Sequence, residues 1–417
     1  MGLEFLEINL EEYDAFERQH VLGTYTQSAN QYKLLQMRNT QSYLVGIKEK
    51  EKLIAAGLIS TATSKFGPVF MFDNGPLIDF DNEKLLNFFI VESKKFAKKH
   101  GVLYIQWTPN LTYAETNNKG EYLNTPNDEI IHRLERYGFK HEPFQYGMST
   151  AGSPTWEYIK KLDDVNNEIE LLKSYTKNVQ YYLKKNKEFG VEVRQLDKSD
   201  LVEFKNLTQA TANRLHYHDK DLEFYQTLYD IYGDQAFFLF AELNFVKYIN
   251  EEQQKYANLE KKLENIQSKI EKYPTQKKFK RQYAEFDDQL QHHLKRISKA
   301  KEQRKLAGQD TVVVAGALFI EQPQEITYLY SGTYETYMDY YGPYQIQNVM
   351  LNKAVEHGIK RYNFYGIAGK FDGSDGVLGF KTAFNGYARQ LVGNFTMPVN
   401  PIKYKIYRLL KTLIGRG

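Results

Sequence analysis

Residues 362–386 are a glycine-rich stretch whose residue types could do chemistry. Five glycines fall between Gly366 and Gly379, and Phe380 and Lys381 follow directly. Glycine at this density allows a backbone to turn sharply or to approach another group closely. A lysine held beside such a backbone could stabilise a developing oxyanion or a leaving phosphate with its charge. The alternative for Lys381, taken alone, is an ordinary surface lysine.

Several common catalytic patterns are absent from the sequence. The glycines fit neither the GxxxxGK[ST] pattern nor the GxGxxG pattern of nucleotide sites. The chain has no cysteine and no GxSxG elbow, which removes thiolate chemistry and that serine mechanism. Two histidine pairs, His216 with His218 and His292 with His293, lack an HExxH frame, so we predict no metal site. What remains is direct transfer between two substrates in a preorganised groove.

The element that stands out most along the chain is a helical arm predicted for residues 246–307. Apolar residues step by three and four from Tyr256 to Tyr273 and again from Phe279 to Ala300. A proline lies between the two runs. This spacing predicts an antiparallel coiled-coil hairpin, in which each helix extends on the order of 40 Å.

The basic charge of the chain is concentrated in this arm. The arm holds 16 Lys and Arg against 9 Asp and Glu, net +7, whereas the rest of the chain has a net charge of −4. A solvated helix face is often charged, but it normally mixes both signs. A tip of one sign is typical of phosphate-backbone binding, and folded RNA is recognised largely through shape and phosphates. We therefore expect folded RNA to contact the tip residues Lys277, Lys278, Lys280 and Arg281.

Strands and helices alternate on both sides of the arm, which predicts a mixed α/β (α+β) fold. Residues 1–150 form one strand–helix set, residues 151–245 with 308–395 form a second, and the arm interrupts the second set. Predicted strands cover residues 43–49, 52–61, 67–78, 102–109, 155–162, 191–196, 236–243, 311–322, 325–334 and 361–368. Predicted helices cover residues 82–101, 128–139, 167–190, 199–214, 221–233 and 343–359. Residues 370–379 are predicted to be a loop over the groove.

Residues 396–417 form a short basic tail with an amphipathic pattern. Its apolar positions, Ile402, Ile406, Leu409, Leu410 and Leu413, alternate with Lys403, Lys405, Arg408 and Lys411. Such a helix either packs on the first strand–helix set or lies on a membrane surface. No run of about 18 apolar residues occurs, and the acidic N-terminus is unlike a secretory signal. We expect a cytoplasmic protein, with the inner face of the plasma membrane as its second expected location.

Six segments of the chain, in order, resemble the FemABX family of aminoacyltransferases, which includes the Fem and MurM/MurN proteins. The resemblance runs along essentially the whole chain, and several motifs in the correct order are specific where one alone would not be. The segments are DNGPLIDFDN (73–82), LYIQWTPNL (103–111), YGFKHEPF (137–144), KKNKEFGVEVR (184–194), HGIKRYNFYGIAGKF (357–371) and GFKTAFNG (379–386).

The resemblance implies two GNAT-like acyltransferase subdomains facing each other across a groove, with the arm inserted in the second. It implies transfer of an amino acid from aminoacyl-tRNA, the co-substrate, to an amine of a peptidoglycan precursor. The acceptor would be the lysine side chain of the stem peptide, or the growing bridge, in lipid II or UDP-MurNAc-pentapeptide. No other cofactor is implied, and the oligomeric state stays open.

The family's residue roles carry over only where positions match. Lys33 matches a lysine that contacts the phosphates of the precursor, and Arg214 matches an arginine near the same anionic group. Tyr217, or His218 in another register, matches a tyrosine of the groove. Tyr328 and Tyr330 match positions that line the acceptor site, and Tyr365 lies on the strand that would line the groove. Phe380 and Lys381 match the pair near the reaction centre, which implies that Lys381 is an electrostatic stabiliser.

Two other functions compete with this interpretation. An acyl-CoA-dependent N-acyltransferase of the GNAT type needs a pyrophosphate-binding turn before a helix, and the sequence contains no convincing one. A non-catalytic tRNA-binding protein would retain the arm but would not need the lysines and tyrosines of the groove. Salt-sensitive tRNA binding with and without residues 246–307 would discriminate between binding by the arm and binding by the body.

Overall fold

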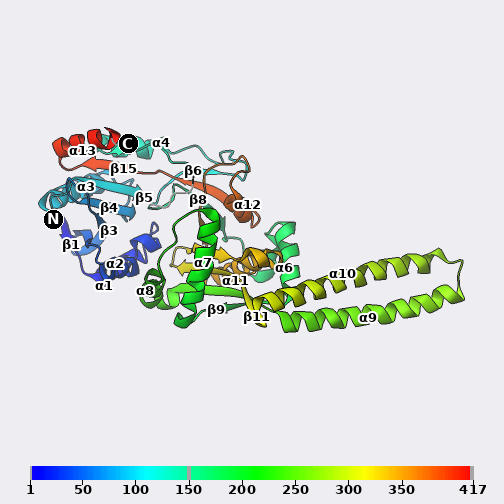
Figure 1. Ribbon diagram of the computed structural model, residues 1–417. Helices are drawn as coiled ribbons and strands as arrows, with labels where there is room; N and C mark the ends of the chain where they lie inside the picture. The colour runs from blue at the N-terminus through cyan, green and yellow to red at the C-terminus, as the bar shows by residue number, and fades with distance from the viewer. Residues whose placement is uncertain (1, 148–151, 414–417) are drawn as a thin grey trace.

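The chain folds into two β-sheets with a long helical arm projecting from one of them (Figure 1). The computed structural model describes residues 2–147 and 152–413. Antiparallel and parallel strand pairs both occur, and helices cover both faces of each sheet. The architecture confirms the prediction of a mixed α/β fold with an inserted arm.

The first sheet has seven strands and two separate apolar cores. On one face, Phe70 and Phe72 pack with Phe89 of helix α3, in a core that also includes α4. The opposite face packs helices α1 and α2 against Leu44 and Leu58. The helices are α1 (Leu10–Glu17), α2 (Ala29–Met37), α3 (Glu83–Lys99) and α4 (Asp128–Arg136), and a short turn of helix, η1 (Tyr25–Gln27), precedes α2. The strand order is β1 (Leu3–Glu7), β2 (Ser42–Glu49), β3 (Lys52–Ala62), β4 (Val69–Asn74), β5 (Tyr104–Pro109), β15 (Phe395–Pro398) and β7 (Lys140–His141).

The second sheet has eight strands and is covered in the same way. One face packs under α11, and the other packs under α7 and α8. The strand order is β6 (Thr112–Thr116), β14 (Tyr387–Leu391), β8 (Trp156–Lys161), β13 (Arg361–Gly366), β12 (Ile326–Thr333), β11 (Thr311–Glu321), β10 (Ala236–Asn244) and β9 (Val191–Gln195). The helices are α5 (Glu168–Lys173), α6 (Lys177–Phe189), α7 (Leu201–Leu215), α8 (Leu222–Tyr232), α11 (Gly342–Glu356) and α12 (Gly376–Thr382), with the short turns η2 (Lys198–Asp200), η3 (Gly233–Gln235) and η4 (Glu335–Tyr340).

The two sheets exchange strands. Strand β6 lies within residues 1–150 yet pairs with β14 of the second sheet, whereas β15 comes from the end of the chain and pairs with β5 of the first. The exchange crosses the boundaries that we predicted at residues 150 and 396, and position 150 itself lies outside the described residues. Because each sheet includes a strand from the other half of the chain, strand pairing joins the two halves.

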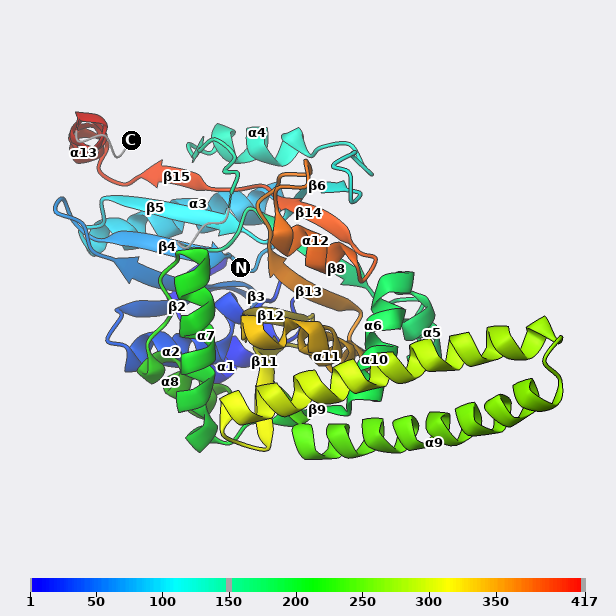
Figure 2. The same cartoon turned by 45° about the vertical axis from the view of Figure 1, so that its right-hand side comes forward.

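The arm consists of α9 (Phe245–Lys272) and α10 (Lys277–Ala307), packed side by side as an antiparallel pair (Figures 1 and 2). Its seam is apolar: Leu259, Leu263 and Leu290 form a separate buried cluster. Asn244 caps the start of α9, and Gly308 ends α10 in the left-handed conformation. The prediction of a helical hairpin over residues 246–307 is confirmed.

Two local predictions are wrong. The helix predicted over 167–190 is two helices, because the Thr176 side chain accepts a hydrogen bond from Val179 N and starts α6 anew. The loop predicted over 370–379 becomes helical at Gly376. There the Asp375 carboxylate accepts hydrogen bonds from the backbone N–H groups of Val377 and Leu378 and starts α12. In both cases a side-chain cap overrides the broader sequence pattern.

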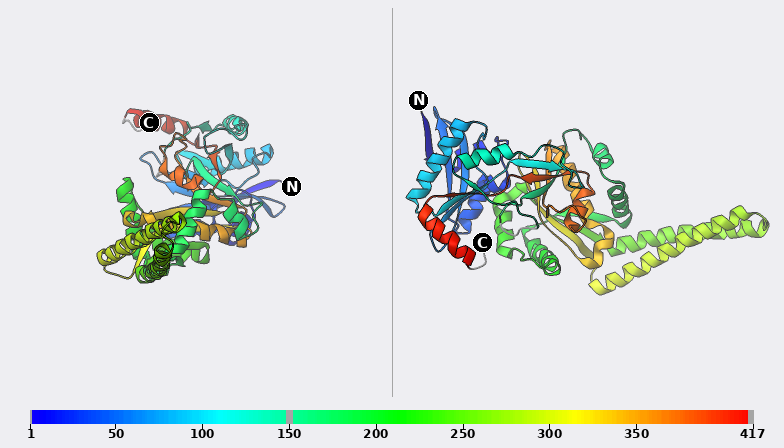
Figure 3. Two further views of the ribbon diagram at one scale, coloured as in Figure 1. Left: turned by 90° about the vertical axis from the view of Figure 1, so that its right-hand side faces the viewer. Right: turned by 90° about the horizontal axis from the view of Figure 1, so that it is seen from above.

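Helix α13 (Pro401–Leu413) lies against the first sheet at the end of the molecule away from the arm (Figure 3). Tyr404 and Tyr407 pack on Tyr104 of β5, and Arg408 pairs with Glu142. The apolar side chains of Ile402, Ile406, Leu409 and Leu410 stay exposed. The side chain of Leu413 and residues 414–417 lie outside the described residues. No helix in the described part of the chain is long and apolar enough to cross a membrane.

Candidate active site between the two sheets

Strands β12 and β13 separate at the centre of the second sheet. They pair in parallel only at Ile326 with Tyr362 and at Thr327 with Asn363. Beyond Asn363 the register between β13 and β8 shifts, which marks a bulge at Phe364 and Tyr365. A bulge re-aims side chains and interrupts pairing. The end of β13 is thereby turned toward the first sheet.

Tyr365 occupies a strained position in this bulge. Its φ angle of 65° lies in the left-handed region, which is uncommon for a bulky residue. The Asn363 side chain accepts a hydrogen bond from Tyr365 N at 2.7 Å. The Tyr365 hydroxyl lies 2.8 Å from the hydroxyl of Tyr25 on η1. The pair connects the two sheets, and strain maintained in this way is typical of functional sites.

Lys381 lies directly behind this bulge. The side chain is buried, and its Nζ donates hydrogen bonds to the carbonyl oxygens of Tyr365 at 3.1 Å and Gly366 at 2.6 Å. Burial lowers the pKa of Lys381 to about 7, although the carboxylates of Asp375 and Glu157 oppose this shift. The structure thus brings Lys381 to Tyr365, and Lys381 is not a surface lysine. Its role as an electrostatic stabiliser stays a prediction.

Phe380 and two glycines of the glycine-rich stretch make close packing contacts. Phe380 packs against Tyr344 and Phe384 on the outer side of α12. A Cβ atom at Gly369 would lie 2.5 Å from the Trp156 ring, and one at Gly386 would lie 2.1 Å from the carbonyl oxygen of Ile159. These glycines are therefore needed for close packing of α12 and its flanking turns on β8.

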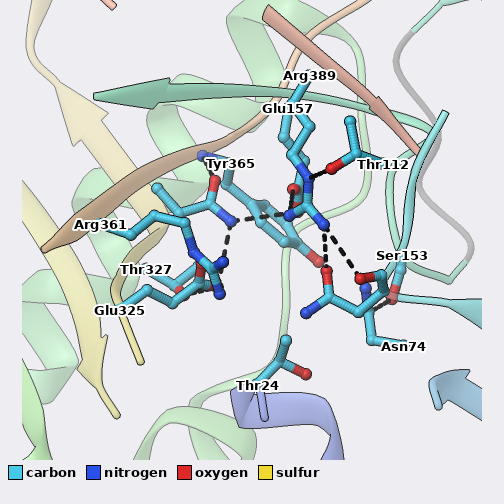
Figure 4. A network of polar contacts seen from close by, with 12 residues as sticks. Thr24, Asn74, Thr112, Ser153, Glu157, Glu325, Thr327, Arg361, Tyr365 and Arg389 are labelled. Carbon is cyan, nitrogen blue, oxygen red and sulfur yellow. Dashed lines mark hydrogen bonds and ion pairs between the residues drawn. The ribbon is translucent and has the colours of Figure 1, made fainter. Parts of the chain in front are cut away.

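A buried network of charges lies around the bulge (Figure 4). Arg389 of β14 pairs with Glu157 of β8 at 3.3 Å, and Arg361 pairs with Glu325 at 2.6 Å. The Asn363 amide donates to both carboxylates, which joins the two ion pairs. Burial raises the pKa of Glu157, and Arg389 opposes the shift. Because these charges are paired and hydrogen-bonded, the network positions β13 rigidly.

Arg389 also connects this network to the first half of the chain. Its guanidinium donates to the Asn110 side chain at 2.8 Å and to Thr112 Oγ1 at 2.9 Å. On the neighbouring side, the Asn74 side chain accepts hydrogen bonds from Thr26 and Ser153. Residues from both sheets therefore meet around the Tyr25–Tyr365 pair.

The predicted tyrosines of β12 point to different surroundings. Tyr328 stacks on Phe319 of the core under α11, whereas Tyr330 packs edge-on against Tyr225 of α8. Burial raises the pKa of each to about 12. Tyr330 also adds to the raised pKa of Tyr365, for which burial is the main cause, so Tyr330 lies near the bulge.

Arg214 and Tyr217 lie at the end of α7, close to β12. Arg214 is exposed and Tyr217 is partly buried. Burial raises the pKa of Tyr217, and the charge of Arg214 opposes this, which places the two side chains near each other. His216 ends α7 in the left-handed conformation. Within the described residues, no cluster of three or more histidines and carboxylates could hold a metal.

Lys33 lines a surface hollow that includes none of the site residues described above. Its Nζ donates to Asn30 Oδ1 at 3.3 Å, and the side chain is exposed. The hollow has a volume of about 480 Å³ and lies where α1 and α2 meet η3. Its lining residues are Leu10, Glu11, Asp14, Arg18, Ala29, Asn30, Lys33 and Gln235. None of the predicted tyrosines lines it, so the contact of Lys33 with the precursor stays a prediction.

Our sequence reasoning missed two residues of the site, Tyr25 and Asp73. Asp73 is the last residue but one of β4 and is opposite Thr108 of β5. Burial raises the pKa of the Asp73 carboxyl, and the Ser60 hydroxyl partly offsets this. The carboxylate also adds to the raised pKa of Tyr365. The available signal for Asp73 was its place at the start of the segment DNGPLIDFDN.

The predicted tRNA contacts lie far from this site, at the arm tip. Lys277, Lys278, Lys280 and Arg281 are all exposed in the first turns of α10. Their contact with tRNA stays a prediction.

Comparison with known proteins decides the family. The FemAB family model matches residues 8–412, which include both sheets and the arm. The chain belongs to the FemAB family. It is 33% identical to the aminoacyltransferase FemA of Staphylococcus epidermidis over 423 residues, covering 99% of this chain and all of that protein. It is 31% identical to FemA of Staphylococcus aureus over 420 residues, with the same coverage.

A solved structure extends this FemAB assignment to the fold. The crystal structure of FemX superposes with a TM-score of 0.77 at 20% identity, covering 97% of this chain and 99% of that one. The predicted family and fold are thereby confirmed, and this FemAB chain is an aminoacyltransferase.

Proposed function

We propose that this FemAB protein transfers an aminoacyl group from aminoacyl-tRNA to an amine of a peptidoglycan precursor, building the interpeptide bridge. The observation that carries the proposal is the family match over residues 8–412, which spans the groove and the arm alike. The polar contacts that join Tyr25, Tyr365 and Lys381 support it, since residues from the two halves of the chain meet there.

The chemistry needs alignment more than activation, because an aminoacyl ester is already reactive. Placing an amine against the ester carbonyl supplies up to roughly 7–11 kcal/mol in ideal cases. An ammonium group has three N–H donors, and Lys381 uses two of them on the carbonyls of β13. In the proposal its third donor stabilises the oxyanion of the tetrahedral intermediate, and Phe380 supports α12 beside it.

The substrates would occupy opposite sides of the groove. Lys33 and Arg214, both exposed cations, would contact the phosphates of the precursor, which is lipid II or UDP-MurNAc-pentapeptide. Tyr217, Tyr328, Tyr330 and Tyr365 would line the acceptor side. The tRNA would extend along the arm to its basic tip, where phosphate contacts need no base recognition.

One reaction tests the proposal. The protein is incubated with lysine-containing lipid II or UDP-MurNAc-pentapeptide and a set of aminoacyl-tRNAs, and the products are weighed by mass spectrometry. The expected result is a mass increase of one aminoacyl residue with at least one tRNA. Transfer from acetyl-CoA in place of aminoacyl-tRNA, or no transfer with any charged tRNA, would overturn it.

A further inference from the structure

Asp73 is a carboxylate close to Tyr365 that the proposed transfer does not yet use. Strand β4 directs Phe72 into the core under α3, and side chains alternate along a strand. The Asp73 side chain therefore faces the opposite side, toward η1, where Gln27 Nε2 donates to the Asp73 carbonyl oxygen at 2.9 Å. That side is where Tyr25 meets Tyr365.

Asp73 lacks a cationic partner within residues 2–147 and 152–413. Among the described residues, no lysine, arginine or histidine forms an ion pair with its carboxylate, whereas Glu157 and Glu325 nearby are both paired with arginines. The residue is of intermediate exposure, and burial of its carboxyl is the main cause of its raised pKa. An unpaired carboxylate in such surroundings is costly unless a cation binds to it.

The side chains named below that surround Asp73 all carry hydroxyl groups, so the Asp73 carboxylate is the proton acceptor among them. From β3 comes the Ser60 hydroxyl, from β5 comes Thr108, and from β13 comes Tyr365. Burial holds the pKa of Tyr25 and Tyr365 far above the ordinary value, so neither hydroxyl is ionised near pH 7. Helix α3 covers the other face of β4 and does not reach the carboxylate.

We propose that Asp73 binds the acceptor ammonium and takes its proton, as the general base of the transfer. This inference rests on the proposed function, since it needs an amine acceptor. A primary amine such as that of lysine has a pKa near 10.4 in water and arrives protonated. A carboxylate whose basicity is increased by burial is suited to accept that proton.

The transfer removes two protons from the nitrogen, forms one C–N bond and breaks one C–O bond. One proton passes from the ammonium to the Asp73 carboxylate, which leaves a neutral amine. The nitrogen lone pair forms the C–N bond at the ester carbonyl carbon, and the C–O bond to the tRNA ribose breaks with its electron pair on oxygen. A second proton passes from nitrogen to that oxygen, and Asp73 releases the first to solvent. The products are an amide, a ribose hydroxyl and one proton.

Asp73→Asn tests the inference, with Asp164→Asn as a matched control at an exposed carboxylate. We expect Asp73→Asn to lower kcat at pH 7 by about 100-fold or more, within the range for loss of a general base. Its rate should then rise about tenfold per pH unit from pH 7 to 9, because only the neutral amine fraction reacts. The wild type and the control should lack this rise.

Asp73→Glu, which keeps a carboxylate, should recover at least tenfold of the lost activity. Melting temperatures of all variants show whether they are folded, and if Asp73→Asn does not fold, the recovery and pH profile of Asp73→Glu relative to the wild type decide. An Asp73→Asn rate within threefold of the wild type, or a lower rate with an unchanged pH profile, would overturn the inference. Absence of product from the wild type would instead overturn the proposed function.

Discussion

At the residue scale, the burial of Lys381 is the feature that most changes how the site is understood. A lysine beside a glycine-rich turn could have been solvated, yet its Nζ is bound to two carbonyls of the bulge. Lys381 therefore supports the left-handed conformation of Tyr365 whatever else it does. Its low pKa follows from burial, which disfavours the charged form.

The pKa of Lys381 predicts a pH-dependent stability. Between its folded value of about 7 and its ordinary value of 10.5, the unfolded chain binds more protons than the folded chain. The free energy of unfolding should rise with pH in this window by up to about 1.4 kcal/mol per unit relative to Lys381→Met. Urea titrations at pH 7.5 and 8.5 measure the difference, and Lys370→Met, at an exposed site, is the control. Parallel curves for wild type and Lys381→Met would contradict the prediction.

At the element scale, the arm separates the basic charge of the chain from its groove. Helices α9 and α10 bury an apolar seam that includes Leu259 and Leu290, so the hairpin is ordered by packing along its length. A short turn between Lys272 and Lys277 joins the two helices at the tip of the arm. A charged tip on a rigid pair of helices is suited to contact a large, negatively charged partner.

The arm-tip lysines are expected to bind tRNA through phosphates. Replacing Lys277, Lys278 and Lys280 with glutamine should weaken tRNA binding and reduce the slope of log affinity against log salt by roughly 2–3, since each lost contact contributes about 0.7–0.9. Fluorescence anisotropy at several salt concentrations measures both. The matched control replaces three exposed lysines of α3, namely Lys84, Lys94 and Lys95. Equal slopes for the two triple variants would rule out the contact.

At the scale of the whole molecule, the arm and α13 lie at opposite ends (Figure 3). Helix α13 is attached by its tyrosines and leaves four apolar side chains exposed beside lysines. This combination is typical of helices that lie on anionic membranes. A molecule resting on a membrane through α13 would leave its arm free to meet tRNA, and a lipid-linked acceptor would be close to the groove.

Vesicle flotation tests membrane contact by α13. Full-length protein should float with vesicles that contain anionic lipids, and Ile402→Glu with Leu409→Glu should abolish this by placing charge on the exposed apolar face. The control carries Val21→Glu and Leu306→Glu, at similarly exposed apolar residues elsewhere. Equal flotation of both double variants would show that α13 does not mediate binding.

The sequence by itself determined the local elements of this protein. Hydrophobic spacing and helix caps depend on residues that are close together in the chain, so a sequence pattern can predict them. Heptad spacing predicted the arm, and Asn82 and Asn127 cap α3 and α4 close to the predicted starts. Local caps also explain the failures, since Thr176 and Asp375 start helices that periodicity alone did not reveal. The family resemblance then identified Lys381 and Tyr365 as candidates without showing that they touch.

Only the tertiary structure decided how the groove is built. Tyr25 and Asp73 are far from Tyr365 and Lys381 in the sequence. The two groups come together because β12 and β13 separate, β13 bulges and the sheets exchange strands. Strand exchange depends on pairing between distant segments, which no local pattern encodes. The burial that lowers the pKa of Lys381 and raises that of Asp73 is likewise a property of the assembled sheets, because it depends on what surrounds each side chain.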